Sequence, residues 1–283
     1  MGEPRVRRLE GRDIDAAIAL TDLEDWGYTR ADFERLLALA PQGCFAAEED
    51  GRVVGVMTTT TYDHLAFLGA VIVSPECRGQ GVGRLLMQAA LLHLASRGVE
   101  TVRLNAYMNV VKFYERLGFQ GEYEVIRWRS AARDREGAPV SVASRDDIDA
   151  IAAFDAPFFG ASRRPLLELL LRENPTTFFV AREGGQVLGY LVGSPFNGAC
   201  EIGPWVVDPG RPEIARDLFR AVVDTVGPRE YSFSGPESNP HLRRFVKDSG
   251  FTEVFRTLRM WWGHDRYPGE PSGLWAAGGL EKG

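Results

Sequence analysis

The chain repeats itself once, and this repeat constrains the fold more than any other feature of the sequence. Three patterns of the first half recur in the second half with an offset of 134 residues. They are Asp-Ile-Asp-Ala from Asp13 and from Asp147, Phe-x-Ala-x-Glu-x-Gly-x-Val-x-Gly from Phe45 and from Phe179, and Val-x-Pro from Val73 and from Val207. At 283 residues the chain has room for two cores. The sequence therefore predicts two homologous domains in tandem.

The two copies leave a short connection and a tail outside them. Residues 133–139 are polar and contain Gly and Pro, which is typical of a linker. The tail ends in an apolar stretch around Leu274 and Trp275, so we expect it to pack on a domain. The predicted divisions are a catalytic domain 1–132, a linker 133–139, a degenerate domain 140–264 and a tail 265–283.

Local patterns place strands and helices in the first copy. Asp13 is the expected N-cap of a helix over 14–20, and Thr29 with Asp32 has the spacing of a capping box. The helix from Val82 is expected to face a sheet with Leu85, Leu86, Ala89 and Leu92, to end at Gly98, and to lead into a parallel strand. A short helix over 110–117 should close at Gly118. The expected strands span residues 5–9, 44–49, 53–61, 65–73 and 101–105.

A glycine-bearing turn joins the strand that ends at Val73 to the helix that begins at Val82. Its glycines, at 79, 81 and 83, let the backbone approach a bulky anion, and the first N–H groups of the helix would face that anion. Arg78 and Arg84 add positive charge. The spacing is neither a dinucleotide fingerprint nor a P-loop, and the whole context predicts a pyrophosphate cradle.

The second copy has lost this cradle. Its equivalent segment, residues 208–215, lacks the later two glycines and carries Pro212, which has no N–H to donate. Glu213 adds a negative charge close to the expected phosphate position. We expect no coenzyme in this copy.

The turn resembles the acetyl-coenzyme A loop of the GCN5-related N-acetyltransferase (GNAT) superfamily, whose pattern is Arg/Gln-x-x-Gly-x-Gly/Ala. Arg78, Gly81 and Gly83 fill the three positions, and Tyr114-x-x-x-Gly118-Phe119 resembles the GNAT segment whose tyrosine approaches the coenzyme sulfur. An intact copy before a degenerate one resembles the tandem-GNAT group that includes YitH-like proteins. This resemblance implies an α/β (α+β mixed sheet) fold of two GNAT-like domains, each a mostly antiparallel sheet flanked by helices.

The resemblance also implies acetyl-coenzyme A as co-substrate, without a metal, and a role for each matching residue. Tyr114 is the expected general acid toward the departing thiolate. A packed core aromatic is the alternative, since the second copy has Val246 at the equivalent position. The expected cofactor-binding residues are Val71, Ile72, Val73, Arg78, Gly79, Gln80, Gly81, Val82, Gly83, Arg84 and Asn109.

GNAT enzymes build the acceptor wall from the segment between the first two helices, which here contains Asp25, Trp26 and Tyr28. The alternative is a solvated linker whose aromatic rings plug the core. Asp25, Asp63 and His64 are candidates for the general base, beside a water chain. Cys77 has no Cys-His partner pattern and is expected to be incidental.

These features predict transfer of an acetyl group to a primary amine of a small metabolite, such as an amino acid, polyamine or amino sugar, within a ternary complex. A non-catalytic acyl-coenzyme A sensor and a protein N-terminal or lysine acetyltransferase are the alternatives. A net charge of −6 argues against a nucleic-acid partner. Three scattered cysteines without metal-ligand spacing, and the absence of any signal or membrane-spanning stretch, predict a cytoplasmic protein. We expect a monomer or a homodimer.

Overall fold

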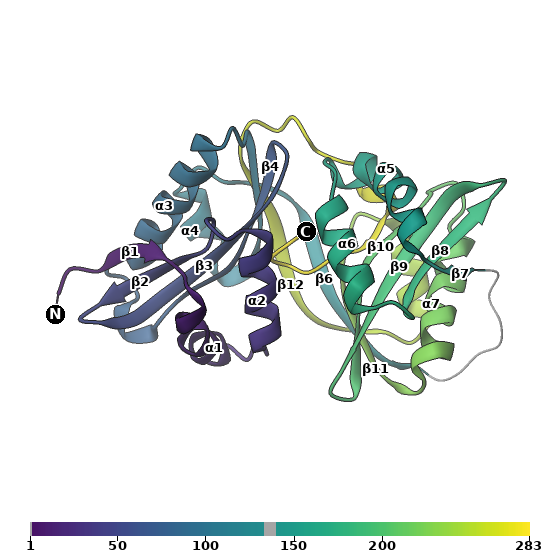
Figure 1. Cartoon of the computed structure of the whole chain (residues 1–283), viewed down its shortest axis with the longest axis horizontal. Helices are drawn as coiled ribbons and strands as arrows, with labels where there is room; N and C mark the ends of the chain where they lie inside the picture. Colours follow the sequence, from purple (N-terminus) through teal and green to yellow (C-terminus); the bar gives the residue numbers. More distant parts are fainter. Residues whose placement is uncertain (1, 133–139) are drawn as a thin grey trace. The chain divides into compact units, whose positions relative to one another are not determined.

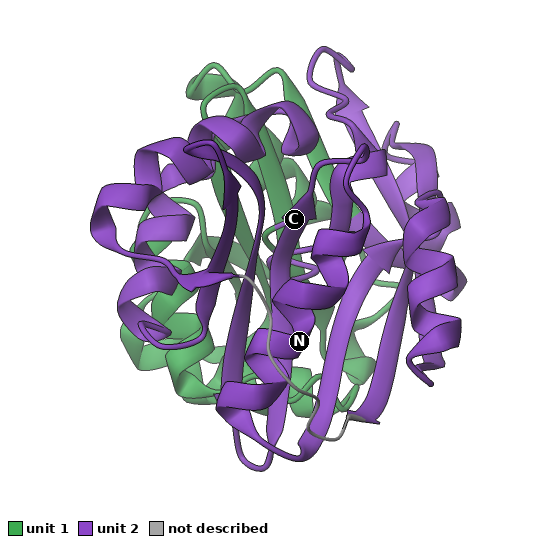
Figure 2. Ribbon diagram, turned by 90° about the vertical axis from the view of Figure 1, so that its right-hand side faces the viewer, with its two compact units in different colours: residues 1–104, 282 green, residues 105–281, 283 purple. Residues whose placement is uncertain are grey.

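The computed structural model describes residues 2–132 and 140–283, so the predicted linker over 133–139 lies outside the described residues. The chain divides into two compact units, which Figure 2 colours separately. Unit 1 contains residues 1–104 and Lys282, and unit 2 contains residues 105–281 and Gly283. The domain boundaries expected from the repeat stay a prediction, and the two units are described in turn.

Unit 1 is a sheet flanked by three α-helices (Figure 1). The sheet order is β1-β2-β3-β4-β5, antiparallel except for the parallel pair β4 and β5. The predicted strands and the parallel crossover are thus confirmed, and β5 continues across the unit boundary. The elements are β1 (Arg5–Arg8), η1 (Gly11–Asp13), α1 (Ile14–Asp22), α2 (Arg30–Leu39), β2 (Phe45–Glu49), β3 (Arg52–Tyr62), β4 (Leu65–Val73), η2 (Pro75–Cys77), α3 (Val82–Ser96) and β5 (Thr101–Tyr107).

The helices cover both faces of this sheet because neighbouring strand residues point to opposite sides. Val56 belongs to the core formed with α1 and α2, whereas a Cβ on Gly55 would meet the side chain of Leu86 in α3. The predicted buried face of α3 is wrong in part: Leu85 is 38% exposed and Leu92 is 73% exposed. Leu86 is buried as predicted, and the helix also buries Val82, Met87, Ala90 and Leu94.

One of the two predicted helix caps in unit 1 is confirmed. The Thr29 hydroxyl accepts the Asp32 N–H at 3.3 Å, and the Asp32 carboxylate accepts the Thr29 N–H at 2.8 Å. Asp13 precedes α1 as expected, but its carboxylate makes no cap bond to that helix. It accepts the Glu10 N–H and forms an ion pair with Arg7, and these contacts lower the pKa of Asp13.

The capping box leads to a stability prediction. Thr29→Ala removes the acceptor for the Asp32 N–H, and we expect the free energy of unfolding to fall by about 1 kcal/mol. Glu34→Ala, on the exposed side of the same helix, is the control and should change stability by less than about 0.5 kcal/mol. Urea unfolding followed by circular dichroism measures both. Equal midpoints for wild type and Thr29→Ala would show that the cap contributes nothing.

Unit 2 repeats the arrangement of a sheet between helices (Figure 1). Its main core joins α7 and α8 to the strands β8 to β11. The elements are η3 (Met108–Val110), α4 (Val111–Glu115), β6 (Gln120–Ala132), β7 (Ser141–Val142), η4 (Arg145–Asp147), α5 (Ile148–Phe159), α6 (Arg164–Glu173), β8 (Phe178–Glu183), β9 (Gln186–Phe196), β10 (Ala199–Val207), α7 (Glu213–Val226), β11 (Arg229–Pro236), α8 (Pro240–Asp248), β12 (Thr252–Gly263), η5 (Pro271–Gly273) and β13 (Leu274–Ala276).

Strand β6 comes from the first copy of the repeat but is a central strand of the unit 2 sheet. It pairs antiparallel with β11 on one side, from Val125↔Pro236 to Ala132↔Arg229, and antiparallel with β12 on the other. The equivalent strand of the second copy is β12, because each follows a Gly-Phe pair. Strand β6 of the first copy therefore lies between β11 and β12, two strands of the second copy.

The apolar tail packs on unit 2, as expected from its sequence. Strands β10 and β11 pair in parallel only as far as Glu201↔Ser232 and then separate. Strand β13 fills the gap: it pairs antiparallel with Trp205 and Val206 of β10, and the Ala277 N–H donates to the Ser234 carbonyl of β11 at 2.8 Å. A Cβ on Gly235 would lie 2.3 Å from the Trp275 carbonyl oxygen, so the contact is close.

Three further observations concern membrane-spanning helices, metal-binding groups and the cysteines. No helix within residues 2–132 and 140–283 is both long and apolar enough to cross a membrane. In the same part of the chain, no group of three or more His, Cys, Asp or Glu side chains is placed to hold a metal ion. The cysteines are buried free thiols, and burial raises the pKa of Cys44 and of Cys200 to about 12.

Candidate active site

The end of β4 is the first part of the site. Within the described residues, the last residue pair between β4 and β5 is Phe67↔Arg103. Strand β4 itself continues to Val73. The register with β3 shifts between Val56 and Thr58, opposite Ala70, whose φ of 47° is left-handed. The two parallel strands therefore separate, as expected, and leave the β5-facing edge of β4 available over its last residues.

The glycine turn follows directly and begins α3. Gly79 (φ 76°) and Gly81 (φ 91°) adopt left-handed conformations that favour glycine, and Gly81 is the N-cap of a 15-residue helix. A Cβ at either position would meet no heavy atom within 4 Å. The open loop and the first N–H groups of α3 thus form a site that can accept an anion.

Polar contacts fix the shape of this loop. Arg78 Nε donates to the Val73 carbonyl at 2.9 Å and its Nη2 donates to Glu24 at 2.7 Å. The Arg78 side chain is 47% exposed, so the pair is accessible to solvent. Gln80 donates to the Glu76 carbonyl at 2.8 Å. Arg78 therefore ties the loop both to the end of β4 and to the segment between α1 and α2, and Arg84 is exposed in the first turn of α3.

The predicted acceptor residues occupy that segment but differ in exposure. Asp25 is exposed and has a φ of 53°. Trp26 and Tyr28 are half-buried against the core, with ring centroids 6.3 Å apart, and Tyr28 lies 5.4 Å from the Phe33 ring. These ring contacts are those expected of aromatic residues that plug the core. The role of the three residues toward an acceptor stays a prediction.

Asp63 and His64, two candidates for the general base, lie at the opposite end of β4 from the glycine turn. Both immediately precede the strand, whereas the glycine turn follows it. Nine residues of strand at about 3.3 Å each separate them from the loop by about 30 Å. His64 Nδ1 lies 2.9 Å from the Gly98 carbonyl oxygen, at the opposite end of α3 from the loop. Both residues therefore lie away from the glycine turn, and their role as a base stays a prediction.

Tyr114 and Asn109 belong to unit 2. Tyr114 in α4 is 7% exposed and packs edge to face on Phe113 and Phe119, with centroid distances of 5.0 and 5.8 Å. Burial raises the pKa of Tyr114, so the phenol stays protonated at neutral pH. The predicted cap Gly118 has a φ of 90°. Asn109 lies exposed in η3.

The equivalent loop of the second copy is closed by its own carboxylates. The Gly210 N–H donates to Asp208 at 2.8 Å, and Arg211 forms ion pairs with Glu213 and Glu183. Trp205 and Val206, the repeat counterparts of Val71 and Ile72, pair with β13. Both the anion loop and the strand edge that are open in the first copy are therefore occupied in the second.

Comparison with known proteins identifies the family. A family described as "Acetyltransferase (GNAT) family" matches residues 14–119, and one described as "Acetyltransferase (GNAT) domain" matches residues 151–276. The chain belongs to the GNAT superfamily. It is an acyltransferase with two GNAT domains in tandem, as the repeat and the glycine turn predict.

Relatives and solved structures agree with this assignment. Holothin acyltransferase of a Pseudoalteromonas species is 25% identical over 264 residues, which cover 92% of this chain and 88% of the relative. The uncharacterized N-acetyltransferase YitH of Bacillus subtilis is 23% identical over 77% of this chain and 78% of its own. A putative acetyltransferase from Pyrococcus horikoshii shares the fold with a TM-score of 0.81 and 22% identity, covering 99% of this chain and 96% of that one.

Some residues of the site gave no recognisable signal in the sequence. Glu24 is 54 positions from its partner Arg78 and is one of several acidic residues in its segment. The tail could be predicted to pack, but not to pair with β10, because strand pairing over such a distance leaves no local pattern. The Arg78–Glu24 pair and the pairing of the tail with β10 therefore correspond to no sequence motif. Only an experiment that detects spatial proximity would have identified them.

Cys77 leads to a prediction about the reaction. Burial and the Glu49 carboxylate, 3.5 Å from the Cys77 sulfur, raise the pKa of this thiol, so it is a poor nucleophile at neutral pH. We expect Cys77→Ala to retain turnover within about twofold, since a thiol without an activating base contributes no covalent step. Steady-state assay of acetyl transfer measures it. A loss above a hundredfold with an unchanged melting temperature would point to a cysteine intermediate.

Proposed function

We propose that this protein is an acetyl-coenzyme A-dependent N-acetyltransferase that acts on the primary amine of a small metabolite. The observation that carries the proposal is the contrast between the two copies of one loop. The first leaves Gly79 and Gly81 open in front of a helix N-terminus, and the second fills the same place with its own Asp208 and Glu213 contacts. A single open cradle implies a single coenzyme.

The residues of the first copy fit the coenzyme chemically. The glycine turn and the first N–H groups of α3 would hold the pyrophosphate, with Arg84 exposed beside them. The free edge of β4 over Val71 to Val73 would pair with the amide-rich pantetheine arm, as β13 pairs with the matching strand in unit 2. Bound acetyl-coenzyme A supplies the thioester carbonyl and the thiolate leaving group.

The chain's own groups then supply orientation and protons. By family resemblance, a backbone N–H near the end of β4 polarises the thioester carbonyl. Tyr114 donates a proton to the thiolate, and its burial keeps it in the donor form. For removal of the amine proton we assign water, with Asp25 as the side-chain candidate on the same segment as Glu24.

A small acceptor is the substrate class that the relatives favour. The relative that matches over 264 residues is named for holothin, a small molecule, and the amines expected here are an amino acid, a polyamine or an amino sugar. Three buried free cysteines fit a reducing compartment, so we place the enzyme in the cytoplasm, as a monomer or homodimer.

An acetylation assay with an amine panel tests the proposal. The protein is incubated with acetyl-coenzyme A and each amine, and release of free thiol is followed. We expect release above background with at least one small amine, and less with peptides that offer an N-terminus or lysine. Thiol release with peptides alone would favour a protein acetyltransferase. Tight binding of acetyl-coenzyme A without release for any amine would favour a sensor.

A further inference from the structure

The Arg78 side chain joins three parts of unit 1. It extends from the glycine turn, and its Nε donates to the carbonyl oxygen of Val73, the last residue of β4, at 2.9 Å. Its Nη2 donates to the carboxylate of Glu24 at 2.7 Å and forms an ion pair with it. Glu24 belongs to the segment between α1 and α2, residues 23–29, which we call the acceptor segment. One guanidinium therefore links the turn, the strand end and the acceptor segment.

Arg84, the second arginine of the turn, has a different environment. It lies exposed in the first turn of α3, beside the N–H groups that would hold a pyrophosphate. A guanidinium at this place adds positive charge where the helix dipole already favours an anion. The sequence places both arginines at the coenzyme, but the structure gives the side chain of Arg78 a carbonyl and a carboxylate of the protein itself.

The acceptor segment depends on local contacts and on this ion pair. Its backbone bonds are short in range: the N–H groups of Glu24 and Trp26 both donate to the Thr21 carbonyl, at 3.1 and 3.3 Å. Asp25 is exposed and has a left-handed φ of 53°. The pair between Glu24 and Arg78 spans 54 positions of the chain, so it fixes an exposed stretch of the segment to the coenzyme loop.

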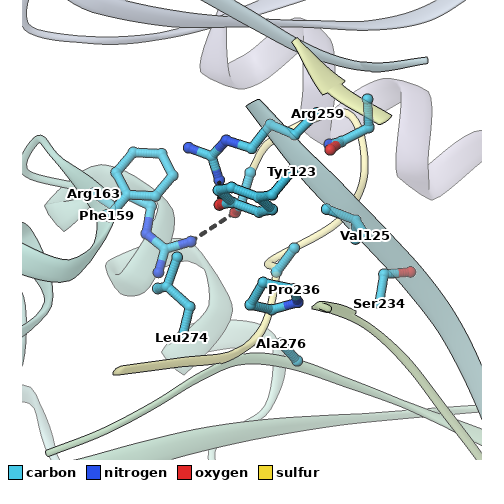
Figure 3. A pocket seen from close by; sticks show the side chains of 12 residues that line it. Tyr123, Val125, Phe159, Arg163, Ser234, Pro236, Arg259, Leu274 and Ala276 are labelled. Atoms are coloured by element: carbon cyan, nitrogen blue, oxygen red, sulfur yellow. Dashed lines mark hydrogen bonds between the residues drawn. The ribbon is translucent and has the colours of Figure 1, made fainter. Parts of the chain in front are cut away.

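The second copy holds its equivalent segment in another way. With the offset of 134, Thr21 and Thr29 correspond to Asp155 and Arg163. Arg163 forms a two-pronged ion pair with Asp155 at 2.9 and 2.6 Å, and neither side chain is more than 1% exposed. Figure 3 shows Arg163 beside the Phe159 ring, whose centroid lies 4.1 Å from the guanidinium carbon. The two threonines of the first copy have no charge and cannot form such a pair.

The second copy also cannot form the link to its loop. Phe158 stands at the position of Glu24 and carries no charge. Arg211, the arginine of the second loop, is paired with carboxylates of its own domain. The link between acceptor segment and loop is therefore present in the copy with the open cradle, and the copy with the closed loop uses a buried internal pair instead.

We propose that Glu24 is a positioning residue for the acceptor: through Arg78 it holds the acceptor segment against the coenzyme loop, while Arg84 supplies the side-chain charge for the coenzyme phosphates. The inference rests on the proposed function and deepens it, because it assigns two arginines of one turn to two different substrates. Breaking the pair loosens the acceptor segment but leaves Arg84 and the N–H groups of α3 in place. The acceptor is then affected more than the coenzyme.

Kinetics of the full chain with matched variants test this division. The KM for L-lysine, spermidine and glucosamine is measured at saturating acetyl-coenzyme A, and calorimetry gives the affinity for acetyl-coenzyme A. We expect Glu24→Gln to raise the KM of the acetylated probe about three- to fivefold and to keep the coenzyme affinity within about twofold of wild type. Arg84→Gln should weaken acetyl-coenzyme A about threefold or more and leave the KM unchanged. Asp22→Asn removes the same charge from the exposed end of α1 and should change neither.

A double variant and hydrogen exchange show whether the two partners act as a unit. Arg78→Gln should also raise the KM, and Glu24→Gln combined with Arg78→Gln should raise it no further than Arg78→Gln alone, because the same pair is already broken. Without any substrate, the amides of Glu24 and Trp26 should exchange faster in either single variant than in wild type. Arg84→Gln should leave their exchange unchanged.

The outcomes separate this inference from the proposed function. A wild-type KM in Glu24→Gln, or effects of Glu24→Gln and Arg78→Gln that simply add, would overturn the inference while acetyl transfer stands. Weaker binding of acetyl-coenzyme A in Glu24→Gln with an unchanged KM would place the pair at the coenzyme and also overturn it. Acetylation of none of the three probes by the wild type would contradict the proposed function itself, and this inference with it.

Discussion

Tyr114→Phe is expected to lower the turnover number by about 10² to 10⁴-fold while leaving the affinity for acetyl-coenzyme A unchanged. The substitution removes one hydroxyl and keeps the ring that packs on Phe113 and Phe119. Because the pKa of Tyr114 is raised by burial, the phenol is fully protonated across the neutral range. Steady-state kinetics should therefore show no alkaline loss of activity from this group between about pH 6 and pH 9.

A tyrosine outside the proposed chemistry provides the control for this variant. Tyr231→Phe removes a hydroxyl from a buried ring that also packs edge to face on a phenylalanine, Phe219, and we expect turnover within about twofold of wild type. Calorimetric titration with acetyl-coenzyme A gives the affinity of each variant separately from its rate. Wild-type turnover in Tyr114→Phe would remove the general-acid role, whereas wild-type affinity with lost turnover supports it.

The cofactor loop could be predicted from sequence because every part of it is local. A strand, three alternating glycines and an amphipathic helix specify backbone conformations within a few residues, and Gly79 and Gly81 adopt the left-handed values that such a turn needs. The capping box at Thr29 and the cap at Gly118 were predictable for the same reason. Comparison of the two copies of the repeat then indicated that residues 208–215 of the second copy no longer form an anion-binding loop.

Features decided by distant contacts could not be predicted in this way. Helix α3 is apolar on more than one side, so periodicity did not show that Leu92 is exposed while Met87 and Leu94 are buried. Asp13 has a cap-forming side chain, but Arg7 and the Glu10 N–H bind its carboxylate instead. Strand β6 pairs with β11 about 100 residues further along the chain, and β13 pairs with β10 about 70 residues before it. Pairing over such distances leaves no local pattern in the sequence.

Gly81→Glu is expected to weaken acetyl-coenzyme A binding by at least about a hundredfold, because its carboxylate competes for the same N–H groups and repels the pyrophosphate. A side chain at Gly81 has space but must adopt a left-handed backbone, so strain needs its own control. Gly98→Glu provides it: Gly98 has a φ of 75°, equally open surroundings and a place at the opposite end of α3. We expect Gly98→Glu to bind like wild type.

Calorimetric titration of the intact chain with acetyl-coenzyme A tests the central claim most directly, since it reports both stoichiometry and affinity. One open cradle beside one closed by Asp208, Glu213 and β13 predicts one equivalent bound per chain, lost in Gly81→Glu and kept in Gly98→Glu. Two equivalents in the wild type, or one equivalent that survives Gly81→Glu with unchanged affinity, would contradict the assignment of residues 71–84 as the single coenzyme site.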